Sequence, residues 1–279
     1  MLSDQDGAKP APMNRESQFS YRCNFVAGRT ECRLKKMNRQ SKFSYLCNQC
    51  GRCCRDKVIT LSPYDVLRLA RAAGISTGEA VARYTIRRGS LLKFGAEGGC
   101  AALDETRCAV HSGRPLACRL YPLGLERTGN EEHFVQLEPA RGSLGVYGAD
   151  GTIEAFLTAQ DVAPYLQTNE HYRRLLPLLR ARIAALVDFD VIEAREFWRR
   201  AVREALAESN CDPNPLIGAL FDPDELGCRR ESDTATVEAH IEALEDSVRR
   251  ETHADILAAA AVLLAVSLGY SPADAMESR

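Results

Sequence analysis

The chain has 279 residues, of which 45% are hydrophobic and 27% charged, with a formal net charge of −2. This length provides for one large domain or two modest ones, and the balanced charge gives no general reason to expect a nucleic acid or a membrane as a partner. The charge is uneven, because residues 1–60 hold twelve Lys/Arg against five Asp/Glu and residues 221–279 hold five against thirteen. We interpret this as two ends that attract each other or that solvate different faces, rather than as a basic arm that touches an anionic partner.

The first residues contain a near-duplicate of the segment that follows. Residues 13–24 (MNRESQFSYRCN) match residues 37–48 (MNRQSKFSYLCN) at nine of twelve positions, at an offset of 24. The first copy keeps Cys23 but lacks the cysteines that follow in the second copy. A decayed duplication explains this, as does a start codon placed too early, with Met37 as the true start. We expect residues 1–36 to be a mobile extension and residues 37–125 to form a cysteine-cluster domain.

Two helices are predicted between residues 62 and 84. Ser62 and Pro63 are typical of an N-cap followed by proline in the first helical turn, and Gly74 is placed to end that helix. Ser76 and Glu79 form the pattern of a capping box, which predicts a second helix through Tyr84.

A small β-hairpin or linker is expected over residues 126–152, with a strand near 133–138 and a turn at 149–152. From Ile153 onward helical periodicity predominates and predicts a helical domain over residues 153–279. Apolar stripes predict helices near 175–187, 194–205, 237–248 and 252–269, with Pro177 kinking or restarting the first of these. The expected fold is mainly α, with an irregular, metal-nucleated N-terminal region.

Seven cysteines in two bursts are the main functional signal. The first burst has the spacing C-x2-C-x2-C-C, and the second is spread over nineteen residues. Thiolates are soft anionic ligands, and so many so close together point to a metal. We predict that all seven are ligands: Cys47, Cys50, Cys53, Cys54, Cys100, Cys108 and Cys118.

Disulfides are a poor alternative explanation. The total of eleven cysteines is odd, Cys53 and Cys54 are adjacent, and the start of the chain has no apolar signal region. The longest apolar run, residues 256–268, is short for a membrane span. We therefore expect a reducing, cytoplasmic setting.

Cations close to the cysteines are expected to offset the thiolate charge and to donate hydrogen bonds to sulfur. The candidates for this role are Arg52, Arg55, Arg114 and Arg119. His111, three residues after Cys108, is a further candidate ligand. Ligand type and number favour an iron–sulfur cluster, such as a four-iron cluster, and leave zinc as the alternative.

The combined pattern resembles the YkgJ-type cysteine-cluster (CxxCxxCC) family. The residues that carry the resemblance are Cys47-x2-Cys50-x2-Cys53-Cys54, Cys100-x7-Cys108 and Arg114-Pro115-x2-Cys118-Arg119-x-Tyr121-Pro122. The resemblance covers residues 43–125 and implies zinc or iron chelation in a bacterial cytoplasm. Some relatives are similar to flagellin lysine N-methylase.

Three functions follow as hypotheses. The first is an iron–sulfur protein with a redox or electron-transfer role and a redox or protein partner. The second is a structural zinc module with a helical scaffold that binds a partner. The third is a lysine N-methylase-like modification enzyme, although no S-adenosylmethionine-binding loop is recognisable. Whether the chain is an enzyme stays open, and no catalytic residue is assigned.

Overall fold

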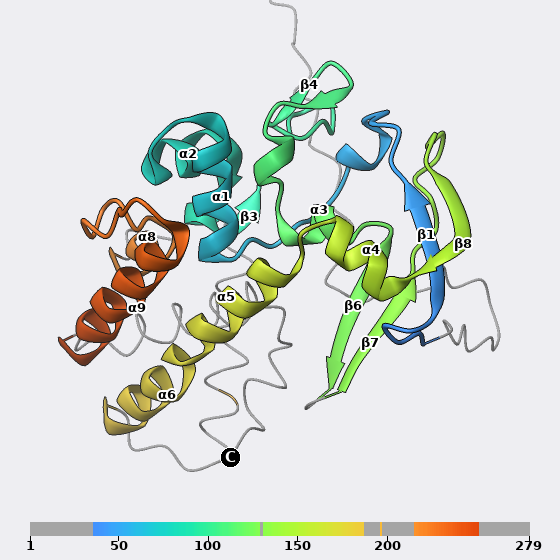
Figure 1. Ribbon diagram of the computed structural model, residues 1–279. Coiled ribbons are helices and arrows are strands. Elements are labelled where there is room, and N and C mark those ends of the chain that lie inside the picture. Colours follow the sequence, from blue (N-terminus) through green and yellow to red (C-terminus); the bar gives the residue numbers. More distant parts are fainter. Residues whose placement is uncertain (1–35, 129–130, 187–195, 197–214, 251–279) are drawn as a thin grey trace, which may run out of the picture. The chain divides into compact units, whose positions relative to one another are not determined.

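The computed structural model describes residues 36–128, 131–186, 196 and 215–250, all of which belong to one compact unit (Figure 1). The helices expected at 194–205 and 252–269 fall outside these residues, apart from Glu196, and so does the first copy of the repeat. Within the described ranges, no helix combines the length and the apolar character that crossing a membrane requires.

Helices alternate with very small sheets in this part of the chain. Four two-stranded antiparallel sheets pair β1 with β8, β2 with β3, β4 with β5 and β6 with β7. The mainly α expectation is therefore confirmed only in part. The bounds of the strands are β1 (Lys42–Leu46), β2 (Thr85–Ile86), β3 (Leu91–Leu92), β4 (Leu103–Asp104), β5 (Arg107–Cys108), β6 (Leu123–Thr128), β7 (Glu131–Gln136) and β8 (Val146–Thr152).

The helices connect these strands and make up most of the described residues after Thr152. Three are 3-10 turns, η1 (Arg52–Cys54), η2 (Arg87–Gly89) and η3 (His111–Gly113). The others are α1 (Pro63–Ala73), α2 (Thr77–Tyr84), α3 (Leu116–Leu120), α4 (Ile153–Ala159), α5 (Ala163–Arg173), α6 (Leu175–Leu186), α8 (Pro215–Phe221) and α9 (Asp233–Arg250).

The predicted helix signals of the N-terminal half are confirmed. Ser62 caps α1, whose proline lies in the first turn, and Gly74 ends the helix in the left-handed conformation at φ 67°. Ser76 and Glu79 form the expected capping box of α2. Pro177 lies in the first turn of α6, so the chain restarts a helix there after α5 ends.

The strand predictions were less accurate. The hairpin of β6 and β7 begins at Leu123, before the expected boundary at 126. Residues 149–152 form part of β8 and not a turn. Their partner is β1, with Tyr45 opposite Tyr147, about a hundred residues earlier in the chain. Glycine and aspartate in this segment suggested a turn, but pairing with a distant strand outweighed that local preference.

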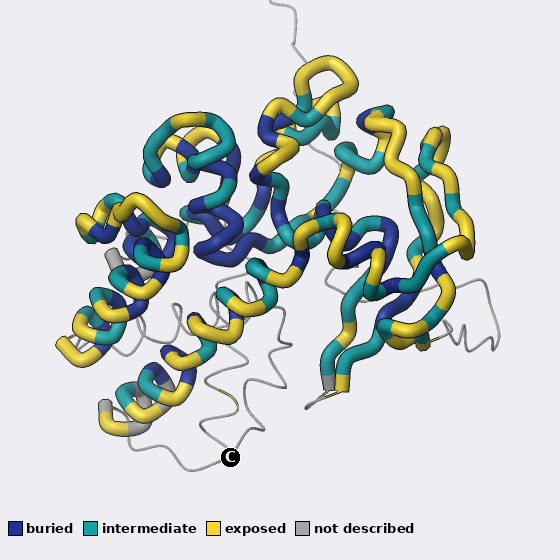
Figure 2. The backbone as a smooth tube through the Cα atoms, in the orientation of Figure 1, coloured by how far each residue is buried: buried dark blue, intermediate teal, exposed yellow. Residues whose placement is uncertain are grey.

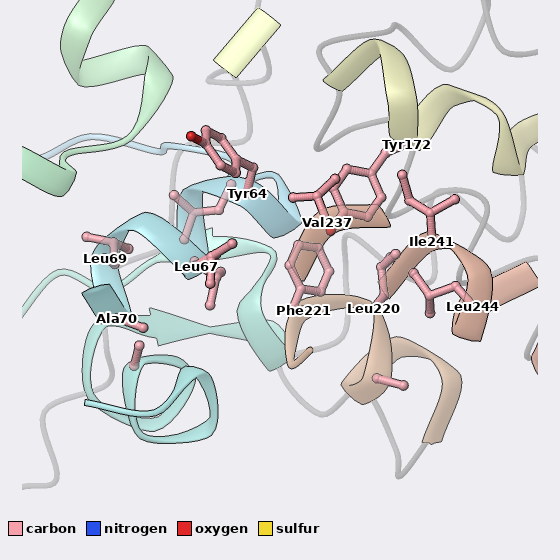
Figure 3. Close-up of a cluster of buried hydrophobic side chains, with 14 of the residues drawn as sticks. Tyr64, Leu67, Leu69, Ala70, Tyr172, Leu220, Phe221, Val237, Ile241 and Leu244 are labelled. Carbon is pink, nitrogen blue, oxygen red and sulfur yellow. The ribbon is translucent and has the colours of Figure 1, made fainter. Parts of the chain in front are cut away.

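Two hydrophobic cores support the molecule. The larger one joins α1 and α2 to α5, α6, α8 and α9. Figure 3 shows part of it, with Leu67 of α1 facing Phe221 and Val237. The smaller core lies among β1, β6, β7, α3 and α4 and includes the fully buried Phe134.

Helix α3 stands between the two cores. Leu116 packs against both, and Leu120 belongs to the smaller core. Figure 2 shows the buried positions along α1 and the exposed outer positions of α5 and α9. Cys118, on α3, is thereby held at the junction of the two cores.

Candidate metal centre

The first cysteine burst lies on a tight turn. Gln49 has a φ of 51° and Gly51 a φ of 68°, both in the left-handed region. A methyl group at Gly51 would also lie 3.0 Å from the carbonyl oxygen of Thr106. Only glycine therefore fits easily where the turn between Cys50 and Cys53 touches the turn that precedes Cys108.

Backbone hydrogen bonds join the two bursts directly. The amide of Cys100 donates to the carbonyl of Cys54 at 3.0 Å, and the amide of Asp56 donates to the carbonyl of Gly98 at 2.9 Å. The β4–β5 hairpin then sets Cys108 opposite Leu103. The last residue of the first burst and the first residue of the second are thus neighbours in space.

Cys118 reaches the same region on α3, whose start is anchored by a buried carboxylate. The amide of Leu116 donates to Asp65 Oδ1 at 2.8 Å, and the amide of Ser62 donates to Asp65 Oδ2 at 2.7 Å. Asp65 therefore connects the N-terminus of α1 with that of α3. Gly113, just before α3, approaches α1 so closely that an added methyl group would lie 2.1 Å from the carbonyl oxygen of Arg68.

Five of the predicted ligands interact with one another electrostatically. Burial raises the pKa of Cys118, and Cys100, Cys108 and Cys53 raise it further. The thiol of Cys54 hydrogen-bonds to Cys53, which raises the pKa of Cys54 and lowers that of Cys53. Such mutual repulsion is what a bound cation would relieve.

Cys50 and Cys47 lie at the edge of this group. Cys50 interacts with Cys53, and its sulfur accepts a hydrogen bond from the amide of Leu144 at 3.4 Å, which lowers the pKa of Cys50. Cys47 is exposed and interacts with Tyr45 and Arg114. Five predicted ligands thus lie close enough to influence one another, and Cys50 and Cys47 lie at the edge of that group.

The donor set fits a thiophilic metal, although the thiols are not in a coordinating arrangement. Among the described residues, no group of three or more His, Cys, Asp or Glu side chains is placed so as to hold a metal ion. Two sulfurs nevertheless already accept amide hydrogen bonds, Cys50 from Leu144 and Cys100 from Ala102, each at 3.4 Å. Bonds of this type are common around thiolate-bound metals.

The four predicted arginines differ in their surroundings. Arg114 interacts with Cys108 and Cys118, and its guanidinium donates to the carbonyl of His111 and to Gln160. Arg119 is buried, and its three guanidinium nitrogens donate to backbone carbonyls of Arg114, Ser112 and Gln160. None of these hydrogen bonds goes to a cysteine, so the expected bond from Arg119 to sulfur is not among its described contacts.

The other two arginines belong to the first burst. Arg52 is exposed, whereas Arg55 is partly buried with its guanidinium beside Gly99. The additional candidate ligand, His111, is exposed, and its Nδ1 lies 3.3 Å from a guanidinium nitrogen of Arg114. Burial and then the nearby Arg114 and Arg119 lower the pKa of His111. None of its described contacts is with a cysteine.

Sequence reasoning missed several residues that surround the site. Lys57 is close enough to help lower the pKa of Cys53, after the hydrogen bond from Cys54. The ring of Tyr45 packs edge-on against Tyr121 at 6.0 Å and Tyr147 at 5.0 Å, and Tyr45 and Tyr121 both interact with Cys53. The pairing of β1 with β8 adds Tyr147 to this group by setting it opposite Tyr45.

Cys228 is separate from the site. It is buried, and its sulfur lies 3.5 Å from the carbonyl oxygens of Leu226 and Ala239.

Comparison with known proteins supports the metal assignment. Residues 46–139 match the CxxCxxCC family model, described as "Putative zinc- or iron-chelating domain". The match includes all seven cysteines of the two bursts, so the resemblance seen in the sequence is confirmed for this part of the chain. No match was found among curated proteins or among solved structures.

Proposed function

We propose that the cysteine cluster holds an iron–sulfur cluster that exchanges electrons with a partner protein in a reducing cytoplasm. The observation that carries the proposal is the number of neighbouring thiols. Cys53, Cys54, Cys100, Cys108 and Cys118 interact with one another, and Cys50 adjoins Cys53. Six thiols, with no histidine contact among those described, are more than a mononuclear zinc site takes and supply the all-cysteine set of four that an iron–sulfur cluster takes.

The surroundings suit a centre whose charge changes. When bound, an iron–sulfur cluster supplies a one-electron donor and acceptor, and hydrogen bonds to sulfur are one of the factors that set its potential. The amides of Leu144 and Ala102 supply such bonds here. Arg114 and Lys57 add positive charge near Cys118 and Cys53. These groups stabilise the more negative, reduced state.

A partner has access at the Cys47 side. Cys47 is exposed, and the neighbouring Leu46 and Leu144 are 63% and 64% exposed. Apolar side chains beside a redox centre favour a short-lived contact with another protein, because they gain from burial without requiring a precise ion-pair geometry.

Analysis of the full chain purified without oxygen tests this proposal. We expect iron and acid-labile sulfide in similar amounts and a visible absorption band that bleaches on reduction with dithionite. Cys100→Ala should lower the iron content strongly, whereas Cys228→Ala, at the buried cysteine outside the site, should leave it unchanged. Colourless protein with stoichiometric zinc and no sulfide would contradict the proposal.

A structural zinc module is the alternative that a specific observation favours. The matching family description names zinc as well as iron, and four thiolates form a common structural zinc site. In that case the helices after residue 153 would serve as a partner-binding scaffold. Zinc without sulfide in the same measurement would favour this alternative.

A further inference from the structure

Exposed apolar side chains lie next to the first cysteine burst. Figure 1 shows β1 and β8 side by side, and Leu46 and Val146 are opposite each other at the end of this sheet. Leu144 lies two residues before Val146. Leu46, Val146 and Leu144 are 63%, 56% and 64% exposed. Single exposed apolar side chains are ordinary, whereas neighbouring ones mark places where another molecule binds.

Hydrogen bonds hold the loop that carries Leu144 against the first burst. The side chain of Asn48 donates to the carbonyl of Leu144 at 2.7 Å, and the amide of Leu144 donates to Cys50 Sγ at 3.4 Å. The backbone of Leu144 is therefore fixed beside a predicted metal ligand. A surface that is already ordered in this way loses little conformational entropy when a partner covers it.

Two exposed arginines, Arg52 and Arg141, border these apolar side chains. A methyl group added at Gly142 would lie 3.9 Å from Nε of Arg52, so the side chain of Arg52 reaches the residue next to Arg141. Neither guanidinium has an ion pair or a hydrogen bond with another of the residues that the structure describes. Arg39, by contrast, pairs with Glu132. The charges of Arg52 and Arg141 are therefore available to carboxylates of another molecule.

The two segments that form this surface contain no acidic residue. Residues 36–55 hold five Lys/Arg and no Asp/Glu, and residues 139–148 hold Arg141 and no Asp/Glu. Glu105 lies on the turn that touches the first burst and offsets part of the charge of Arg52, so Arg141 is the better position for a test of charge. The local potential is therefore positive, although the whole chain has a net charge of −2.

We propose that a small electron-carrier protein with carboxylates around an apolar centre docks on the Leu144 surface, which consists of Leu46, Leu144, Val146, Arg52 and Arg141. This inference rests on the proposed iron–sulfur role. Apolar contact at Leu144 and carboxylates at the two arginines would set the partner's redox centre beside Cys50. One electron then passes between that centre and the cluster, so one of them is oxidised and the other reduced, and no bond is formed or broken.

The charge of the Leu144 surface suits a protein better than a membrane or a nucleic acid. Basic segments that bind anionic lipids use about four to eight Lys/Arg, and nucleic-acid sites neutralise several phosphates. The two exposed arginines of this surface supply less charge than either of these partners needs. They are enough to steer and orient a protein that carries carboxylates.

Binding of the full chain to two electron carriers of opposite charge tests the proposal. The probes are an acidic plant-type ferredoxin and cytochrome c, which presents a basic face, and titration calorimetry at low ionic strength measures the dissociation constant. We expect ferredoxin to bind less tightly as salt is added, and cytochrome c not to bind. Arg141→Glu should weaken ferredoxin binding by roughly tenfold, and Leu144→Ser, which removes apolar contact area, by a similar factor.

Arg83→Glu is the matched control. Arg83 is an exposed arginine of α2, a helix of the larger core, and its substitution makes the same change in charge. Arg83→Glu should leave ferredoxin binding within about twofold of that of the unsubstituted chain. Arg141→Lys, which keeps the charge, should weaken binding less than Arg141→Glu. Equal weakening by Arg83→Glu and Arg141→Glu, or no binding of ferredoxin at all, would overturn the proposal.

Other occupants of the Leu144 surface give different results. Sedimentation of the full chain with phosphatidylserine vesicles, without binding to ferredoxin, would assign the surface to a membrane and overturn the proposal, as would a dimer that dissociates in Leu144→Ser. Binding does not require electron transfer, so its outcome is separate from the metal analysis. Iron and sulfide without ferredoxin binding would refute only the docking surface. Ferredoxin binding that depends on Arg141 in colourless zinc protein would support the surface and refute the iron–sulfur role.

Discussion

Asp65 stabilises the site with both of its carboxylate oxygens. One oxygen caps α1 through Ser62, and the other accepts from the amide of Leu116 at the start of the helix that carries Cys118. Burial raises the pKa of Asp65, and these hydrogen bonds oppose that rise. The sequence predicted the Ser62 cap because capping is local. The bond to Leu116, fifty-one residues away, leaves no local pattern and could not be predicted.

Gly51 offers a test of the contact between the two bursts. Gly51→Ala should destabilise the protein by about 1–2 kcal/mol for the left-handed backbone alone, and by more because its methyl group would meet Thr106 at 3.0 Å. We expect it also to weaken metal binding, since Cys50 and Cys53 flank the turn. Denaturant unfolding and metal titration of the variant would measure the two effects.

Gly74→Ala is the matched control. Gly74 has a φ of 67°, close to that of Gly51, but an added methyl group there meets nothing within 4 Å. The Gly74→Ala variant should therefore lose only the free energy of unfolding that the left-handed backbone accounts for, and it should bind metal normally. Equal effects of the two substitutions would mean that the contact with Thr106 contributes nothing.

At the scale of elements, the predictions succeeded where the signal lay within one helix. The caps of α1 and α2 and the apolar face of α9 could all be predicted from the sequence. The pairing of β1 with β8 could not be predicted, because strand partners distant in sequence are selected by packing. The same pairing sets Tyr147 against Tyr45, so this contact beside the cysteines was missed with it.

A buried histidine joins three helices of the larger core. His240 of α9 has its Nε2 2.8 Å from the carbonyl oxygen of Ala219 in α8, and its Nδ1 2.7 Å from the hydroxyl of Tyr172 in α5. Because a carbonyl only accepts, Nε2 carries the proton and Nδ1 accepts from Tyr172. Burial lowers the pKa of His240 to about 4, from an ordinary value of 6.5.

This geometry predicts a loss of stability in acid. As the pH falls below 6.5 the unfolded chain binds a proton at His240, while the folded chain does not until about pH 4. The stability is therefore complete above pH 6.5 and falls by on the order of 3 kcal/mol towards pH 4. His240→Gln, which keeps a donor and an acceptor, should flatten this dependence in denaturant unfolding. His171→Gln, at an exposed position of α5, should retain it; an unchanged slope in His240→Gln would refute the assignment.

At the scale of the whole molecule, the site lies where separately predictable parts meet. Cys100 and Cys108 pack against the larger core, and α3 connects that core with the smaller one. The cysteine spacing was enough to predict the candidate ligands. Which of them are neighbours depends on both cores, and so could not be predicted from spacing. The marginal position of Cys47 is one result of this.

The amount of bound metal in Cys54→Ala, in Cys100→Ala and in the double variant tests whether both bursts contribute to a single metal centre. These two residues come from different bursts and are joined by a backbone hydrogen bond of 3.0 Å. If the centre is shared, each single substitution should release as much metal as the double one. Two partial losses that add up in the double variant would mean that each burst binds metal independently, and would contradict the account.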